Sequence, residues 1–221
     1  MSAKRLIIFD LDGTLLNTIT DLAHATNYAL LQLGFPYHNV EEYKYFVGNG
    51  MLRLFERALP ENERNEANFL AMRKHFLPFY ERHNSVFTKP YEGIYELLTN
   101  LQSAGLKFAV ASNKYHKATE ELIRRYFPHI DFVAVFGQRE GIPVKPSPAI
   151  VFEILQKAGI AAKETLYVGD SGVDMQTALN AGIDSVGVTW GFRPRAELEK
   201  HGAKYIIDTP SKLQKYVTPN F

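Results

Sequence analysis

Two aspartates, Asp10 and Asp12, follow a short apolar run and precede a Gly-Thr pair. The run, residues 6–9, is a continuous aliphatic and aromatic stretch bounded by charge and glycine, which predicts a buried strand. Because side chains alternate along an extended chain, residues 10 and 12 should point to the same side. Two carboxylates so close hinder each other's ionisation, so the pair indicates a cation or a proton between them. For such a pair taken alone, a solvated turn is the alternative.

Further polar residues stand beside the ends of other predicted strands, namely Ser112-Asn113, Lys145, and Gly169-Asp170 with Asp174. In an open parallel sheet, ligands bind outside the carboxyl ends of the strands. Carboxylates bind Mg²⁺ there, and lysine and hydroxyl groups donate to phosphate oxygens. Each residue alone is typical of a turn, a helix cap or the surface, but the set in this order predicts a magnesium–phosphate site.

The elements that must position these residues alternate from about residue 88 onward. Apolar runs predict strands over 107–111, 132–136, 165–168 and 185–188. Amphipathic stretches predict helices over 93–104, 116–126, 147–158 and 173–181, the third beginning with a Ser147 N-cap and Pro148 in its first turn. An edge element at 206–207 and a last helix over 211–217 complete the set. This alternation predicts an α/β fold with a doubly wound parallel sheet.

Residues 18–87 interrupt that alternation. Helical periodicity is present over 21–33, 41–59 and 62–83, with no convincing strand. A structureless loop of this length is improbable inside a compact protein, so we expect a helical insertion. The expected organisation is a core domain from residues 1–17 and 88–221, with a helical domain from residues 18–87.

Composition narrows the class of protein. Of the 221 residues 46% are hydrophobic, which suffices for a buried core, and the formal net charge of +1 gives no reason to expect nucleic acid or membrane partners. Cysteine is absent, which excludes disulfides and thiolate metal sites. With no secretory or membrane-spanning segment, a soluble cytoplasmic protein is expected. A monomer and a homodimer both remain open.

Four segments together resemble the motifs of the haloacid dehalogenase superfamily, namely Asp10-Leu11-Asp12-Gly13-Thr14, Ser112-Asn113, Lys145-Pro146 and Gly169-Asp170-Ser171-x-x-Asp174. The resemblance covers essentially the whole chain, and the helical insertion resembles the type-1 cap of that superfamily. Segments 47–50, 90–93 and 188–191 are most similar to phosphoglycolate phosphatases. The resemblance implies a central strand before Asp10, with the strands before Ser112 and Asp170 on either side.

The resemblance also implies catalytic roles. Asp10 would be the nucleophile that forms an aspartyl-phosphate, and Asp12 the general acid and base. Mg²⁺ would be bound by an Asp10 oxygen, the Asp12 backbone carbonyl and Asp170, with Asp174 supporting the site directly or through water.

The substrate would be a small phosphorylated metabolite. Its phosphate oxygens would be held by Lys145, Ser112 and the backbone amides around Gly13, with Asn113 as a positioning residue. In the cap, Asn49 between two glycines is a candidate substrate ligand, although such a pair of glycines is more often a helix break. For Arg53 and Arg57, a solvated helix face is favoured over a binding role.

Two alternatives stay open. Within the superfamily, the chain could be a phosphomutase or a phosphonate hydrolase, the latter needing a cap lysine, for which Lys44 and Lys74 are the candidates. From a different class, a receiver-like phosphoacceptor signalling domain also uses acidic residues, a hydroxyl and a lysine with magnesium. The magnesium-dependent phosphatase is the favoured interpretation.

Overall fold

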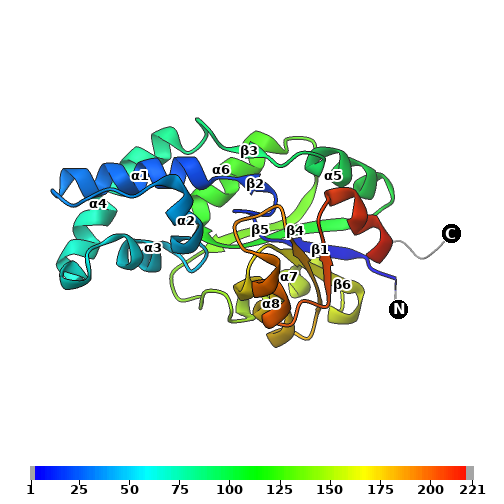
Figure 1. Cartoon of the computed structure of the whole chain (residues 1–221). Helices are drawn as coiled ribbons and strands as arrows, with labels where there is room; N and C mark the ends of the chain where they lie inside the picture. The colour runs from blue at the N-terminus through cyan, green and yellow to red at the C-terminus, as the bar shows by residue number, and fades with distance from the viewer. Residues whose placement is uncertain (1–2, 218–221) are drawn as a thin grey trace.

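The computed structural model describes residues 3–217 and contains a six-stranded parallel sheet (Figure 1). Strand β1 (Leu6–Phe9) lies between β4 (Lys107–Tyr115) and β6 (Thr165–Gly169). The full order is β5-β4-β1-β6-β7-β8, where the others are β5 (Phe132–Gln138), β7 (Asp184–Val188) and β8 (Tyr205–Ile207). The expected doubly wound α/β fold is therefore confirmed, with the strand before Asp10 in the expected position.

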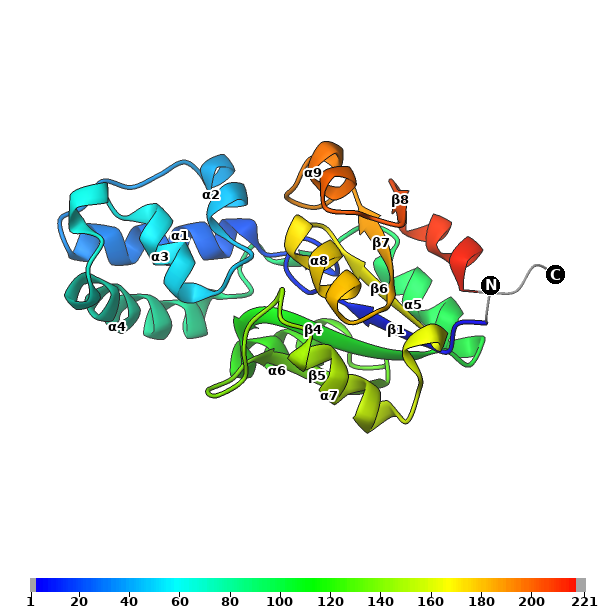
Figure 2. The ribbon, with the colours of Figure 1, turned by 90° about the horizontal axis from the view of Figure 1, so that it is seen from below.

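Helices cover both faces of the sheet (Figures 1 and 2). Alternation along β1 sends Ile7 and Phe9 into one hydrophobic cluster, and Leu6 and Ile8 into another. The first cluster is completed by α5 (Ile94–Ser103), α6 (His116–Tyr126) and the 3-10 helix η3 (Pro210–Tyr216). The second is completed by α7 (Ala149–Ala158) and α8 (Gly172–Asn180). Burial on both faces explains why the strands read as continuous apolar runs.

Four helices stand together beyond the carboxyl ends of the strands, at the left of Figure 1. They are α1 (Ile19–Gln32), α2 (Val40–Phe46), α3 (Met51–Ala58) and α4 (Glu66–His83). Their apolar side chains form a third cluster, to which the rest of the chain contributes Ala118 and Phe192. An antiparallel pair of two-residue strands, β2 (Leu16–Asn17) and β3 (Lys89–Pro90), lies where the chain enters and leaves this helical layer.

Several element boundaries differ from those predicted. The helical stretch over 41–59 is divided into two helices, because Gly48 and Gly50 adopt positive φ angles of 109° and 84° that a continuing helix does not allow. Strand β4 continues four residues beyond the predicted end, to Tyr115. Pro148, not Ser147, is the N-cap of α7, and the last segment is a 3-10 helix. Strands β2 and β3 were not predicted.

Short elements complete the chain, namely η1 (Glu61–Glu63), η2 (Ala162–Glu164) and α9 (Arg195–Lys200). Within residues 3–217, every helix is too short or too polar to span a membrane.

Candidate functional site

Asp10 lies directly after the central strand, at the carboxyl edge of the sheet. Its backbone amide donates to the Val168 carbonyl of β6 over 2.9 Å, which fixes the residue beside that strand. Its carboxylate accepts the amide of Leu11 at 2.7 Å and pairs with Lys145 Nζ at 3.0 Å. The residue is only 8% exposed. The fold thus holds a buried carboxylate with one oxygen oriented by the backbone and by a lysine.

Two further carboxylates approach Asp10. Ligand oxygens of Asp10, Asp170 and Asp174 all lie within 4.8 Å of one another. Asp170 follows β6 and accepts the Phe192 amide at 2.7 Å. Asp174, in the first turn of α8, accepts the backbone amide and hydroxyl of Ser171 at 3.1 and 2.6 Å, as the capping box of that helix. The predicted residues from two strand ends and one helix therefore meet in one acidic cluster.

Lys145 lies within this cluster and is 2% exposed. Its Nζ donates to Asp174 Oδ1 at 2.7 Å in addition to its pairing with Asp10. Asn113 holds the backbone of Lys145 in place, since its Oδ1 accepts the Lys145 amide at 2.8 Å and its Nδ2 donates to the Lys145 carbonyl at 3.1 Å. The same Nδ2 donates to the Gly48 carbonyl at 3.0 Å. Asn113 therefore positions the lysine and joins it to the helical layer.

The charges in this cluster do not balance. Burial, and then the neighbouring Asp174, raise the pKa of Asp10 to about 7, although Lys145 acts to lower it. Burial, Asp174 and Asp10 raise the pKa of Asp170 well above its usual range. Burial disfavours the charge on Lys145, but Asp10 and Asp174 outweigh it and raise the pKa of the lysine. One lysine among three buried carboxylates leaves excess negative charge, and oxygen ligands of this kind fit a hard divalent cation.

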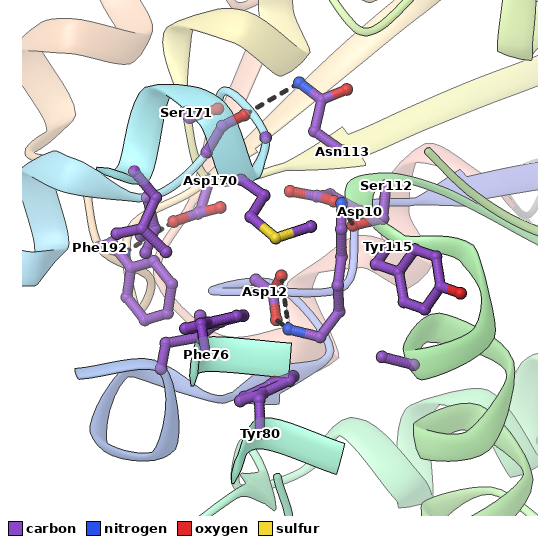
Figure 3. Close-up of a pocket in the computed structure, with 18 of the residues that line it drawn as sticks. Asp10, Asp12, Phe76, Tyr80, Ser112, Asn113, Tyr115, Asp170, Ser171 and Phe192 are labelled. Atoms are coloured by element: carbon purple, nitrogen blue, oxygen red, sulfur yellow. Dashed lines mark hydrogen bonds and ion pairs between the residues drawn. The ribbon is translucent and has the colours of Figure 1, made fainter. Parts of the chain in front are cut away.

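Asp12 points toward the same cavity as Asp10, as the two-residue spacing predicts, but its carboxylate lies outside the acidic cluster. Thr18 Oγ1 donates to Asp12 Oδ1 at 2.6 Å, and Lys114 Nζ lies 3.0 and 3.2 Å from its two oxygens. The Lys114 ammonium also stands 4.8 Å from the centre of the Tyr80 ring, a cation–π contact with α4. Figure 3 shows Asp12 between the sheet edge and this tyrosine.

Sequence reasoning missed Lys114. The predicted strand ended at residue 111, whereas β4 continues past it. Lys114 follows Ser112 by two residues in that extended segment, and both line the cavity. The alternation that linked Asp10 with Asp12 would have identified Lys114 as well, had the strand been extended.

The structure places the remaining predicted residues as follows. Ser112 is buried beside the cavity, and its hydroxyl accepts the Lys114 amide at 3.2 Å. The amide of Gly13 donates to the Leu16 carbonyl at 2.9 Å. A Cβ on Gly13 would lie 2.3 Å from Asp170 Oδ2, and its φ is +87°, so only glycine allows this approach to the acidic cluster.

Asn49 is not brought to the cavity, although Gly48 and Gly50 line it. Arg57 Nη2 donates to Asn49 Oδ1 at 2.8 Å, while its Nη1 donates to the carbonyls of Tyr45 and Phe46 at 3.2 and 3.0 Å. Arg57 therefore braces the turn between α2 and α3, and Arg53 pairs with Glu56 on the surface.

The cavity lies between the sheet edge and the helical layer (Figure 3). Its polar wall comes from the sheet edge, and its apolar wall includes Leu22, Met51, Leu54 and Phe76 from the helices. Among the described residues, the lysines and arginines that line it are Lys114 and Arg193, both outside α1–α4. Lys44 and Lys74, the candidates for a cap lysine, are not part of its lining. Arg193 was also missed by sequence reasoning.

The sequence and fold of this chain are similar to those of known hydrolases. A sequence model of the family described as "Haloacid dehalogenase-like hydrolase" matches residues 7–188. The phosphoglycolate phosphatase of Vibrio parahaemolyticus is 33% identical over 218 residues, covering 96% of each chain. That of Aquifex aeolicus is 32% identical over 216 residues, covering 96% of this chain and 95% of its own.

A solved structure from Lactobacillus delbrueckii subsp. bulgaricus, provisionally assigned as a phosphoglycolate phosphatase, superposes with a TM-score of 0.91 at 34% identity. The superposition covers 99% of this chain and all of the other. The helical layer is therefore shared with the relative as well as the sheet.

The raised pKa of Asp10 predicts a pH-dependent stability in the absence of metal. In the unfolded chain the carboxyl has its ordinary pKa of 3.8, whereas in the fold it is about 7. Between these values the folded state binds more protons, so this group's contribution to the free energy of unfolding falls as pH rises. An Asp10→Asn variant lacks this titration. In urea denaturation with EDTA, the free energy of unfolding of wild type minus that of the variant should fall between about pH 4 and pH 7. A difference that stays flat or rises would contradict the charge imbalance.

Proposed function

The chain belongs to the haloacid dehalogenase-like hydrolase family, and from this premise we propose that it is a magnesium-dependent phosphatase of small phosphomonoesters such as 2-phosphoglycolate. That it is a phosphatase enzyme follows from its family and its relatives. The observation that carries the proposal is Asp10, held by Lys145 at the edge of a cavity and beside two further buried carboxylates. The substrate rests on the names of the curated relatives.

Asp10 is the proposed nucleophile. Its carboxylate oxygen would attack phosphorus and form an aspartyl-phosphate, while the bond from phosphorus to the leaving oxygen breaks. The Lys145 contact and the Leu11 amide hold the carboxylate in one orientation, which lowers the entropic cost of attack. Ser112, which lines the cavity, and Lys145, which is buried against Asp10, are the proposed donors to phosphate oxygens.

Asp12 is the proposed general acid and base. It would protonate the leaving oxygen, then take a proton from the water that attacks phosphorus and breaks the bond to Asp10. Its placement supports this role, because its carboxylate faces the cavity and is held by Thr18 and Lys114. Lys114 is thereby a proposed positioning residue.

A divalent metal fits the acidic cluster, and Mg²⁺ is the proposed ion because the available ligands are oxygens. Asp10, Asp170 and the Asp12 backbone carbonyl would hold it, with Asp174 in support. The metal would supply charge neutralisation at the phosphoryl group. Asp174 already bonds Lys145 and Ser171, which suits it to orienting the other ligands.

Residues 18–87 are the proposed cap domain, and residues 1–17 and 88–221 the proposed core domain. The cap supplies the apolar wall of the cavity, which limits the water around the reacting groups. A phosphonate hydrolase is disfavoured because the cavity is lined by no lysine from helices α1–α4, within the described part of the chain. A phosphomutase stays the alternative, and a cytoplasmic location stays a proposal.

Phosphate release from a panel of phosphorylated metabolites, with Mg²⁺ and with EDTA, tests the proposed function. We expect turnover that requires the metal and is highest for a small acidic phosphomonoester. Absence of phosphate release from every substrate, together with transfer of phosphate between positions of a sugar phosphate, would favour the mutase instead.

Asp10→Asn should abolish turnover, because an amide oxygen is a poor nucleophile for phosphorus. The variant should melt no lower than the metal-free wild type near neutral pH, since it removes one of three clustered carboxylates. Steady-state phosphate release and thermal melts check both points. Loss of a covalent nucleophile usually lowers kcat by far more than about 100-fold. A folded variant that keeps more than about a hundredth of wild-type kcat would therefore contradict the nucleophile role of Asp10.

Asp12→Asn should lower kcat by about 10²–10⁴-fold, the usual contribution of proton transfer. Lys114→Met should lower kcat by up to about 10²-fold through misplacement of Asp12. Asp131→Asn, at an exposed position, is the matched control and should be within about twofold of wild type. Native activity in the Asp12 variant would contradict the acid–base role.

A further inference from the structure

Arg193 lies in the loop after β7, one residue beyond the amide that holds Asp170. Its side chain lines the cavity and is 10% exposed. The Phe192 amide donates to Asp170 at 2.7 Å, so the backbone that carries Arg193 is fixed directly beside the acidic cluster. The proposed reaction assigns no role to this arginine.

The guanidinium is only partly satisfied. Nη2 donates to the Val47 carbonyl at 2.9 Å, Nε lies 3.4 Å from Glu197 Oε2, and the group stands 5.5 Å from the centre of the Tyr45 ring. Nη1 is buried and has no hydrogen-bond partner among the described residues. A buried donor left unpaired is costly, so this nitrogen is suited to an acceptor that the protein itself does not supply.

The other cations near the cavity are already engaged. Lys114 contacts both oxygens of Asp12, and Lys145 is shared by Asp10 and Asp174. Arg193 thus offers the unused cationic donor of the cavity lining described here. Its planar guanidinium is well suited to a carboxylate. Two of its neighbours, Val47 and Tyr45, belong to the helical layer, so the guanidinium lies between that layer and the loop after β7.

We propose that Arg193 binds a second anionic group of the substrate, a carboxylate on the leaving group, through Nη1. The loop after β7 then determines which phosphomonoesters the enzyme prefers, while the sheet edge carries the phosphoryl chemistry. This inference rests on the proposed function. The preference for an acidic leaving group would then come from Arg193, in the loop after β7, and not from Arg53 or Arg57 of α3.

The test compares 2-phosphoglycolate with ethyl phosphate, which shares the phosphoryl group and the first carbon but lacks the carboxylate. The quantity measured is the ratio of kcat/KM for the two substrates, in wild type and in Arg193→Gln. We expect the variant to lower this ratio by roughly 10- to 100-fold, the range for a lost hydrogen bond to a charged group. A role limited to bracing the helical layer would lower both values together and leave the ratio unchanged.

Two companion variants sharpen the result. Arg193→Lys keeps a cation but lacks Nη1, so its ratio of kcat/KM values should lie between those of wild type and Arg193→Gln. If the Arg193→Gln variant does not fold, Arg193→Lys takes its place in the test. Arg195→Gln removes an exposed arginine two residues away that pairs with Glu199, and its ratio should be within about twofold of wild type.

An unchanged ratio in both folded Arg193 variants overturns the inference and leaves the proposed phosphatase standing. A wild-type protein that releases phosphate from other members of the metabolite panel but from neither of these two substrates also overturns the inference alone. A wild-type protein that releases phosphate from no member of the panel overturns the proposed function, and the inference with it.

Discussion

The site depends on one buried lysine shared by two carboxylates. Lys145 is 2.7 Å from Asp174 and 3.0 Å from Asp10, and almost no solvent reaches it. Loss of the lysine would leave its buried carboxylates without their cation, which is strongly destabilising. The surrounding structure fixes the lysine from both sides, with Asn113 on its backbone and the α8 capping box on Asp174. A third carboxylate, Asp170, lies beside this pair, and the three carboxylates together could hold a divalent cation.

The helical layer forms the wall of the cavity that lies opposite the sheet edge. Its apolar side chains line the cavity opposite the sheet edge, while the acidic residues of the proposed reaction come from the sheet side. Contact between the two parts includes the glycine turn between α2 and α3, where Asn113 and Arg193 donate to the carbonyls of Gly48 and Val47. Electrostatic interactions strengthen when water is excluded. The helical layer, which excludes water from the cavity, therefore strengthens the interactions of the acidic cluster with charged groups.

Much of this arrangement could be predicted from the sequence. The apolar runs and the two-residue spacing of Asp10 and Asp12 depend on local periodicity, which the fold preserves. The gathering of Lys145, Asp170 and Asp174 at one edge of the sheet was predicted from the topology of a parallel sheet, whereas the ion pair of Lys145 with Asp174 was not. Lys114 was missed because a strand end was placed four residues early. Helical periodicity continues across Gly48 and Gly50, so only the two glycines themselves indicated a break there. Arg193 could not be found, since its importance lies in an unpaired nitrogen that only tertiary structure reveals.

Chemical trapping of the covalent intermediate tests the central claim most directly. The enzyme would be quenched in acid during turnover of 2-phosphoglycolate with Mg²⁺, reduced with borohydride, and digested for peptide sequencing. An acyl phosphate is reduced to an alcohol, so a phosphorylated Asp10 would be read as homoserine at position 10. Homoserine at that position is the predicted result. An unmodified Asp10 during sustained turnover, or homoserine at another aspartate, would contradict the assignment on which the account rests.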